Sequence, residues 1–302
     1  MNWHRCTLLP HACRRHDTKA TGLYAGATMS QAERTRKFRA LHQAATPFVI
    51  PNPWDIGTAR IFKALGFQAL ATTSAGFANA QGLPDGGITR DMAMQHCREI
   101  VNATDLPVSA DLENGFVDSP EHVAETIRLA AETGLSGCSI EDASRAPGNP
   151  IYDFNLAVER VAAAVEAARA LPHDFVLTAR AENLLRGRND LDDTIKRLQA
   201  FEKAGADVLY APALRSAEQI KAVCAAVTKP VNVLAGMANF PHTVDELGRM
   251  GVKRISLGSA LANAAFGAVI DAARDIQDNG RFTFVAKGAS HKTLTDFFTP
   301  YA

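Results

Sequence analysis

Short apolar runs alternate with helical patterns eight times along this chain, and this alternation constrains the fold more than any other feature. The runs lie at residues 48–51, 69–73, 108–112, 137–141, 175–179, 208–210, 231–234 and 254–257. Helical patterns follow them at 56–65, 90–102, 119–133, 155–171, 190–204, 216–227, 243–250 and 259–278. Alternating strands and helices of this kind form parallel sheets. Eight such units within the length of one domain predict a (β/α)8 TIM barrel.

Three further segments complete the predicted architecture. A helix over 30–45 precedes the first strand, with Ser30 and Glu33 as its capping box. Residues 74–88 hold four glycines and a proline, which predicts a long loop after the second strand. Residues 282–302 lie beyond the eighth helix, and their apolar pattern predicts an extra helical segment that packs on this subunit or on a neighbouring one.

An open, doubly wound sheet is the alternative arrangement of such units. That fold binds phosphates at a glycine-rich turn after its first strand. The turn here reads Pro51-Asn52-Pro53-Trp54, and no Gly-x-Gly-x-x-Gly follows a strand. The sequence therefore favours the barrel and argues against a dinucleotide enzyme.

The composition suits one large domain, which we expect to span residues 29–302. The chain has 302 residues, 47% of them hydrophobic, which is enough for a complete barrel core. Its 32 basic and 32 acidic residues cancel, so nothing indicates a nucleic-acid partner or an anionic membrane surface. No apolar run approaches the roughly 20 residues that a membrane helix needs.

Residues 1–28 differ from the rest, because they are basic, contain one acid (Asp17) and show no periodicity. We interpret them as a disordered or non-native extension, with a transit peptide as the alternative. The five cysteines form no CxxC pair and no zinc-site spacing. They fit reduced thiols in the cytoplasm, which is the expected compartment. We expect Cys97, Cys138 and Cys224 to be small buried hydrophobic residues rather than nucleophiles.

Acidic residues gather at the ends of the predicted strands. Asp111 and Glu113 follow the third strand, Glu141 ends the fourth, and Asp85 lies in the long loop. The C-terminal ends of barrel strands converge on one mouth, where the chemistry of such folds lies. Several carboxylates there repel one another unless a metal neutralises them, and all-oxygen ligation suits Mg²⁺, with Mn²⁺ as the alternative. These four residues are the candidate metal ligands, with Asp111 the candidate for direct coordination.

Other groups at the predicted mouth suit an anionic substrate. Arg180 ends the fifth strand, where a guanidinium can clamp a carboxylate or phosphonate. Thr73 and Ser74 offer hydroxyl and backbone N–H groups, although ordinary turn chemistry accounts for them equally well. A simple ion-pair network, in which Glu141 and Asp142 pair with Arg180, is the alternative to a metal site.

Trp54 and Asn232 also lie at strand ends and are candidate substrate contacts. Asp55 follows Trp54 directly, and its position favours a helix N-cap over a catalytic role.

Taken together, these motifs resemble the isocitrate lyase/phosphoenolpyruvate mutase superfamily. The matching segments are Pro51-Asn52-Pro53-Trp54-Asp55, Thr72-Thr73-Ser74-Ala75-Gly76, Gly82-Leu83-Pro84-Asp85, Ser109-Ala110-Asp111-Leu112-Glu113-Asn114-Gly115-Phe116, Ser139-Ile140-Glu141-Asp142 and Thr178-Ala179-Arg180, within residues 38–261. The resemblance implies a (β/α)8 barrel, a Mg²⁺ site and a small substrate with a 2-oxo or 2-hydroxy acid unit. It also implies a homotetramer, a dimer of dimers in which the C-terminal helix is exchanged between subunits.

The resemblance also assigns roles by motif position. Asp85, Asp111, Glu113 and Glu141 would be the metal-shell carboxylates. Thr73, Ser74 and Arg180 would hold the carboxylate end of the substrate. Glu113 stands where the family usually has Asp, and its side chain is one methylene longer.

The loop after the fourth strand departs from the lyase branch of this superfamily. Lyases carry a Lys-Lys/Arg-Cys-Gly-His loop whose Cys delivers a proton to the enolate. Here Asn149 stands at the position of that Cys, and the phosphonate-handling branch has Asn at the corresponding place. An amide is no general acid near neutral pH, but it can hydrogen-bond a transferring group.

The resemblance therefore implies a Mg²⁺-dependent enzyme that cleaves or rearranges a C–P or C–C bond through an enolate. Its nearest analogues are the phosphonomutases and phosphonopyruvate hydrolases, and Glu141, Asn149 and Arg180 are the expected catalytic residues. The alternatives are a C–C lyase like methylisocitrate or dimethylmalate lyase, an oxaloacetate decarboxylase, and an inactive barrel that binds a small acid.

Overall fold

Eight parallel strands form a nearly closed barrel in the computed structural model, which describes residues 29–146 and 148–301. The strand order is β1-β8-β7-β6-β5-β4-β3-β2. A hydrogen bond of 3.0 Å from Ala71 N to Pro51 O links β2 to the end of β1. The chain therefore has the predicted (β/α)8 fold. The extension expected at 1–28 lies outside the described residues.

The strands are short, and almost all of their residues are buried, as their apolar runs predict. They are β1 (Phe48–Ile50), β2 (Leu70–Ala71), β3 (Val108–Asp111), β4 (Gly137–Glu141), β5 (Val176–Arg180), β6 (Val208–Tyr210), β7 (Val231–Leu234) and β8 (Arg254–Ser256). Their register places Glu141 opposite Arg180, and Arg180 opposite Tyr210. Polar strand ends from neighbouring strands thus meet at one edge of the barrel.

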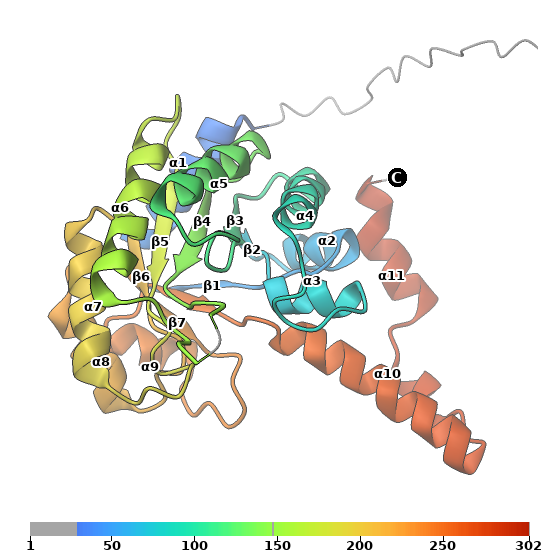
Figure 1. Cartoon of the computed structure of the whole chain (residues 1–302). Coiled ribbons are helices and arrows are strands. Elements are labelled where there is room, and N and C mark those ends of the chain that lie inside the picture. Colours follow the sequence, from blue (N-terminus) through green and yellow to red (C-terminus); the bar gives the residue numbers. More distant parts are fainter. Residues whose placement is uncertain (1–28, 147, 302) are drawn as a thin grey trace, which may run out of the picture.

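Helices surround the strands on the outside (Figure 1). They are α1 (Gln31–Gln43), α2 (Ile56–Ala64), α4 (Arg90–Ala103), α5 (Pro120–Glu132), α6 (Phe154–Arg169), α7 (Leu191–Lys203), α8 (Ala217–Ala226), α9 (Val244–Arg249) and α10 (Ala260–Asn279). Each begins within two residues of its predicted start. The capping box of Ser30 and Glu33 is present, and Asp55 caps α2 by accepting the Thr58 N–H at 2.7 Å.

The prediction of a long loop over 74–88 is wrong for its first half. Residues Ser74–Ala80 form helix α3, which Thr73 caps by accepting the Gly76 N–H at 3.2 Å. Phe77 and Ala78 bury the inner face of this helix. The misleading signal was Gly76, which reads as a loop residue. It is small for a packing reason, since a Cβ there would lie 2.6 Å from the Thr73 methyl group.

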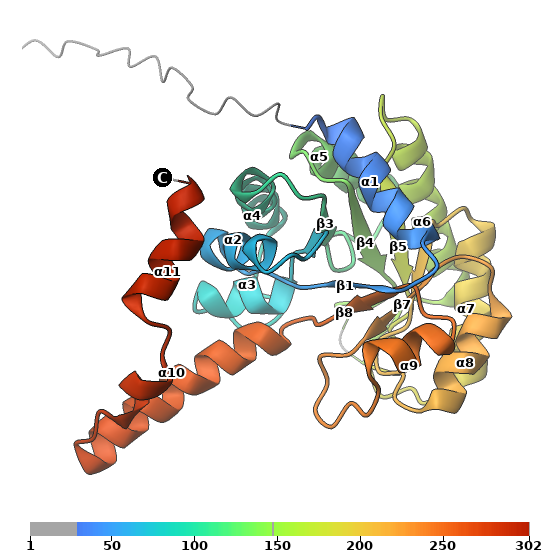
Figure 2. The same cartoon turned by 180° about the vertical axis from the view of Figure 1, so that it is seen from behind.

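The C-terminal segment is helical, as predicted. After α10 it forms the short helix η1 (Thr283–Lys287), then α11 (His291–Phe298) and η2 (Thr299–Tyr301). Helix α10 extends away from the barrel, and the following segment returns to α2 (Figure 2). There the Arg60 guanidinium lies 4.5 Å from the centre of the Tyr301 ring. The chain thus packs its own end on its second helix, while much of α10 stands clear.

Two remaining sequence expectations can be checked in the fold. Cys97 and Cys138 are buried and Cys224 is half-buried, and burial raises the thiol pKa to about 12 for Cys97 and about 11 for Cys224. All three therefore remain protonated, unlike nucleophilic cysteines. Within the part of the chain that the structure describes, no helix is both long and apolar enough to span a membrane.

A buried histidine makes the barrel sensitive to acid. His42 packs edge-on against Phe38 and Phe48 near the start of β1, and its Nδ1–H donates to Phe38 O at 2.8 Å. Its Nε2 has no hydrogen-bond partner among the described residues. Burial, with a smaller contribution from the charge of Arg254, lowers the pKa of His42 to about 3. The folded protein therefore keeps this imidazole neutral.

We predict that His42 reduces stability in mild acid. Below the ordinary imidazole pKa of 6.5, His42 binds a proton in the unfolded chain but stays neutral in the folded chain. The unfolding free energy therefore falls as the pH drops from 6.5 toward 3. Between about pH 7 and pH 5 this linkage amounts to about 2 kcal/mol. Urea unfolding should be measured for wild type and His42→Gln at pH 7 and at pH 5. Between these two pH values, wild type should lose about 2 kcal/mol more unfolding free energy than the variant. Parallel pH curves would contradict the prediction.

Candidate active site

Five of the sequence-predicted residues line one cavity of about 440 Å³ at the C-terminal mouth of the barrel. They are Ser74, Asp85, Glu113, Glu141 and Arg180. A smaller space of about 40 Å³ lies against the same Arg180, and Asp111 lines it. The convergence follows from the parallel topology, which brings the ends of β2, β3, β4 and β5 to neighbouring positions. The cavity therefore combines carboxylates with one deeply placed guanidinium.

Arg180 holds the centre of this arrangement. Its Nη1 lies 3.3 Å from Glu141 Oε2 and 3.7 Å from Asp111 Oδ1, and its Nε donates to Glu182 Oε1. The guanidinium carbon lies 5.1 Å from the centre of the Tyr210 ring. Glu182 is fully buried, and the Arg180 side chain is 14% exposed. The surrounding carboxylates outweigh the burial penalty and raise the pKa of Arg180 well above its usual range, so it stays charged.

Asp111 is fixed from several sides. Its Oδ2 accepts the Ser74 hydroxyl at 2.9 Å and the Ser74 N–H at 3.3 Å, and its backbone N–H donates to the Thr72 hydroxyl at 3.0 Å. Its other oxygen accepts the Glu113 N–H at 3.3 Å. These bonds tie Ser74, the first residue of α3, to the end of β3.

Two half-exposed arginines pair with the cavity's acids from the rim. Arg145, on the loop after β4, donates to Glu113 Oε2. Arg186, on the loop after β5, bonds Glu182 at 3.1 Å and approaches Glu141 at 3.5 Å. Both side chains are more than two-fifths exposed. Exposed ion pairs of this kind contribute little stability and are easily exchanged for other partners.

The cavity retains an excess of negative charge. Counted over the cavity and the smaller space beside it, Asp85, Asp111, Glu113, Glu141 and Glu182 are five carboxylates, against the four guanidinium groups of Arg145, Arg180, Arg186 and Arg254. Burial, and then the charge of Asp111, raises the pKa of Glu113. Burial also raises the pKa of Glu141 well above its usual range, despite the opposing charge of Arg180. Both groups would therefore gain from an additional cation.

The residues fit a divalent cation in charge and in donor chemistry. The carboxyl groups outnumber the guanidinium groups, and all the donors are oxygens, as Mg²⁺ and Mn²⁺ prefer. Glu113 Oε1 is buried and has no hydrogen-bond partner among the described residues. As the side chains stand, however, no three His, Cys, Asp or Glu of residues 29–146 and 148–301 converge into a coordination shell. Arg145 and Arg180 engage the carboxylates instead.

The loop after β3 has a strained backbone that buried groups hold in place. Glu113 and Phe116 adopt left-handed φ values of 49° and 64°, which cost free energy for residues other than glycine. Arg160 of α6 lies fully buried beneath this loop and donates to the carbonyls of Asn114, Val117 and Asp118. The guanidinium thus fixes the turn that aims Glu113 into the cavity.

Tyr152 ties that turn to the loop after β4. Its hydroxyl donates to Asp118 and accepts from Asn114 Nδ2 at 2.9 Å, and its ring lies 4.2 Å from the Arg160 guanidinium. The loop itself closes as a hairpin, since Ala143 and Ile151 form an antiparallel bridge. Arg145 therefore projects from a short hairpin with a firm base.

Asp142 does not pair with Arg180. The alternative ion-pair network, in which both Glu141 and Asp142 would contact Arg180, is therefore wrong for Asp142. It forms a 3.0 Å ion pair with Arg197 of α7, and it accepts the Glu182 N–H at 2.7 Å. Both charged groups are almost fully buried. Asp142 thus anchors the loop after β5 from behind, while Glu141, the preceding residue, faces Arg180.

Four candidate site residues do not line the cavity. Thr73 is the cap of α3, and Trp54 is half-buried with its N–H on the Thr58 hydroxyl at 3.3 Å. Asn232 lies inside the barrel, where its amide donates to the Ser256 hydroxyl and accepts from Arg254 Nε. Asn149 is exposed and accepts from Arg188 at 3.0 Å. Their roles in substrate binding or catalysis remain predictions.

The sequence reasoning missed Arg186, Arg197, Arg160 and Tyr152. Each lies on a loop or helix outside the strand ends on which that reasoning relied. The spacing of Arg186 four residues after Glu182 was the available signal, because it lets a turn return the guanidinium to the carboxylate. The other three have no local signal, since their partners come from different elements.

Comparisons with known proteins agree with this geometry. The sequence profile of phosphoenolpyruvate phosphomutase matches residues 38–277. A probable 2-methylisocitrate lyase of Corynebacterium glutamicum is 30% identical, over 86% of this chain and 85% of its own length. A crystal structure from Burkholderia cenocepacia, named provisionally as a lyase/mutase, is 54% identical and superposes with a TM-score of 0.86, covering 89% of this chain and 96% of its own. Another from the same organism, named provisionally as a phosphonomutase, is 37% identical with a TM-score of 0.75, covering 82% and 99%.

We predict that breaking the buried Asp142–Arg197 pair destabilises the barrel strongly. Arg197→Met leaves a buried carboxylate without its cation, which costs about 3–5 kcal/mol of unfolding free energy. Adding Asp142→Asn removes the uncompensated charge and should restore part of the loss. Urea unfolding measures both, with the exposed Arg249→Met as the control variant. A single Arg197→Met variant as stable as wild type would contradict the buried-pair account.

Proposed function

This chain belongs to the phosphoenolpyruvate phosphomutase family, within the isocitrate lyase/phosphoenolpyruvate mutase superfamily, and from this premise we propose that it is a Mg²⁺-dependent enzyme acting on a small 2-oxo or 2-hydroxy acid. The reaction would cleave or rearrange the bond from C3 to phosphorus or carbon, with an enolate as the intermediate. The observation that carries the proposal is the buried Arg180 guanidinium within a cavity of excess negative charge.

The metal would be held by the carboxylates that the cavity brings together. Asp85, Asp111, Glu113 and Glu141 supply oxygen donors of the right type, with Mn²⁺ as the alternative to Mg²⁺. When bound, the cation supplies positive charge that stabilises negative charge developing on the substrate oxygen. The unpartnered Oε1 of Glu113 supports a ligand at this place.

The chain's own residues would position the acid and its charge. Arg180 would bind the substrate carboxylate, because its guanidinium is held rigidly by Glu182 and stacks on Tyr210. Rigid donors aimed at developing charge need no reorganisation during the reaction. Ser74 would add a hydroxyl and an N–H beside Asp111. Arg145 and Arg186 would exchange their exposed ion pairs for substrate contacts as they exclude water.

The loop after β4 favours phosphonomutase- or phosphonopyruvate-hydrolase-like chemistry. Asn149 would have to leave Arg188 to reach the cavity, where its amide could hydrogen-bond a transferring phosphoryl group. The 37% identity to the provisional phosphonomutase is consistent with this reading. The second candidate is C–C cleavage, favoured by the relative named 2-methylisocitrate lyase. That reaction would need a proton donor other than the absent loop cysteine.

A homotetramer with exchanged C-terminal helices is our proposal for the assembly. Helix α10 stands clear of the barrel (Figures 1 and 2) and exposes Val269 by 66% and Ile270 by 47%. Phe282 and Val285 of the following segment are two-thirds exposed. Exposed apolar side chains of this size are costly in water and favour burial against another subunit.

We predict metal-dependent turnover within a panel of four substrates. Purified protein should lose activity in EDTA and regain it with Mg²⁺ on at least one of phosphonopyruvate, oxaloacetate, methylisocitrate and dimethylmalate. Asp111→Asn should weaken Mg²⁺ binding in calorimetry and lower kcat by at least about 100-fold, because it removes a charge from the metal shell.

Asp245→Asn, on an exposed position of α9, is the matched control and should retain both properties. Full turnover by Asp111→Asn would refute the metal assignment. Mg²⁺-dependent binding of these acids without turnover would instead identify an inactive acid-binding barrel.

We predict that the α10 face holds the assembly together. Light scattering should give wild type the mass of four chains of 32.4 kDa. Val269→Asp places a charge on the proposed interface and should shift the protein to smaller species, with its circular dichroism unchanged. A monomeric wild type would contradict this assembly.

A further inference from the structure

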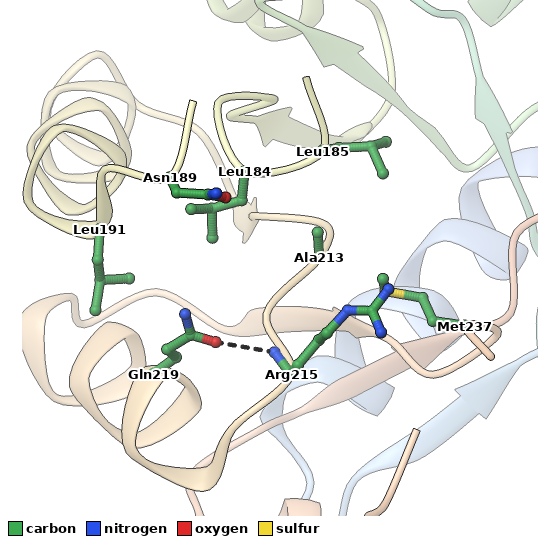
Figure 3. Close-up of a pocket in the computed structure, with 8 residues that line it drawn as sticks. All are labelled: Leu184, Leu185, Asn189, Leu191, Ala213, Arg215, Gln219 and Met237. Atoms are coloured by element: carbon green, nitrogen blue, oxygen red, sulfur yellow. Dashed lines mark hydrogen bonds between the residues drawn. The ribbon is translucent and has the colours of Figure 1, made fainter. Parts of the chain in front are cut away.

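A second cavity opens beside the active site and shares a wall with it. It has a volume of about 330 Å³ and lies between the loops that follow β5, β6 and β7 (Figure 3). Leu185 lines both cavities, and its neighbour Arg186 lines the active-site cavity. Leu185 is 42% exposed and is the residue that the two linings share. The two cavities therefore meet at the turn that carries Leu185.

The side cavity has apolar walls and a polar end. Leu184, Leu191 and Met237 form apolar walls, together with Leu185. The polar groups are the side chains of Asn189, Arg215 and Gln219, and Figure 3 shows the Arg215 side chain extending across the cavity toward Met237. No acidic residue lines the cavity. Its lining thus suits an apolar chain that carries an anionic end.

Three polar side chains of this cavity have donors without a partner among residues 29–146 and 148–301. Gln219 Oε1 accepts the N–H groups of Arg215 and Ser216 at 3.1 and 3.3 Å, which directs its NH₂ group elsewhere. Neither that NH₂ group nor the Asn189 side chain makes a hydrogen bond to a described residue, and the Arg215 guanidinium forms no ion pair with one. Asn189 and Arg215 are exposed and Gln219 is half-buried, so these donors are free to hydrogen-bond a carboxylate that enters the cavity.

The backbone that carries Arg215 is held in place. Its N–H is fixed by Gln219, and its carbonyl accepts from His242 Nε2 at 3.1 Å. Two residues earlier, Ala213 has a φ of 70°, in the left-handed region that a residue with a Cβ adopts at a cost. Strain of this kind persists where surrounding contacts over-determine the conformation, commonly at ligand sites.

We propose that this side cavity binds the distal end of the substrate. The substrate would be a 2-oxo or 2-hydroxy acid with an apolar chain that ends in a second carboxylate, which Arg215 would recognise. This inference rests on the proposed function, because the first carboxylate must be held by Arg180. Leu185 would lie beside the passage between the two cavities, so the site would also bind dicarboxylic acids longer than the compact acids of the substrate panel, and would bind them more tightly as the chain fills the side cavity.

The test uses binding to the full chain in Mg²⁺, measured by calorimetry. The probes are oxalate, the series 2-oxoglutarate, 2-oxoadipate, 2-oxopimelate and 2-oxosuberate, and 2-oxooctanoate, which lacks the terminal carboxylate. Each methylene that enters an apolar cavity should raise affinity about fourfold. Affinity should therefore rise along the series and then level off, and 2-oxooctanoate should bind more weakly than 2-oxosuberate.

Two variants separate the side cavity from the active site. Arg215→Gln should weaken the best diacid at least about tenfold while leaving oxalate within about twofold. Met237→Trp should fill the cavity and abolish the gain with chain length. Arg249→Gln, on an exposed position of α9, is the control and should behave as wild type.

The outcomes distinguish the inference from the proposed function. Normal oxalate binding with a flat series, or a diacid preference that survives in Arg215→Gln, would overturn the side-cavity proposal alone. Failure of oxalate itself to bind in Mg²⁺ would contradict the proposed function, and the inference with it.

Discussion

Uncompensated negative charge at the mouth of the barrel is the constraint on which the rest of the site depends. Burying carboxylates costs several kcal/mol each unless a cation or hydrogen bonds compensate. Arg180 compensates part of this cost by contacting Asp111, Glu141 and Glu182. Because the barrel brings in more acids than arginines, the site favours a further cation, as the enolate chemistry that we propose would require.

The site combines a rigid floor with adaptable rim groups. Arg180, Glu182 and the Asp142–Arg197 pair are buried and fixed by several contacts each. Arg145 and Arg186 sit at the rim on exposed ion pairs that can be given up to an entering substrate. In the proposed reaction, this division would keep fixed groups where charge develops and movable groups where the substrate enters. The side cavity beyond Leu185 extends the same pattern, with a fixed backbone and uncommitted donors.

Much of the fold followed from the sequence because barrel strands and helices carry local signals. Apolar runs and capping residues such as Ser30 and Asp55 mark the elements, and parallel topology then fixes where strand ends meet. The cavity residues Ser74, Glu113, Glu141 and Arg180 were found in this way. Helix α3 was missed because Gly76 serves close packing rather than a turn, which no local pattern reveals.

The remaining misses concern side-chain partners across the fold. Whether Asp142 faces the mouth or α7 depends on Arg197, 55 residues later in the chain. Asn232, chosen for its strand position, is bonded inside the barrel, and Asn149, chosen from the family resemblance, is exposed on the loop after β4; their roles remain predictions. Strand position thus identifies which residues approach a site, and long-range pairing decides which of them enter it.

The central claim is that a divalent cation binds among these carboxylates, and crystals grown with Mn²⁺ and oxalate test it most directly. The account predicts one anomalous manganese peak per chain, within coordination distance of at least two of Asp85, Asp111, Glu113 and Glu141, with oxalate bridging it to Arg180. A saturated crystal without a peak in this cavity, with Arg145 and Arg180 still paired to the same acids, would contradict it.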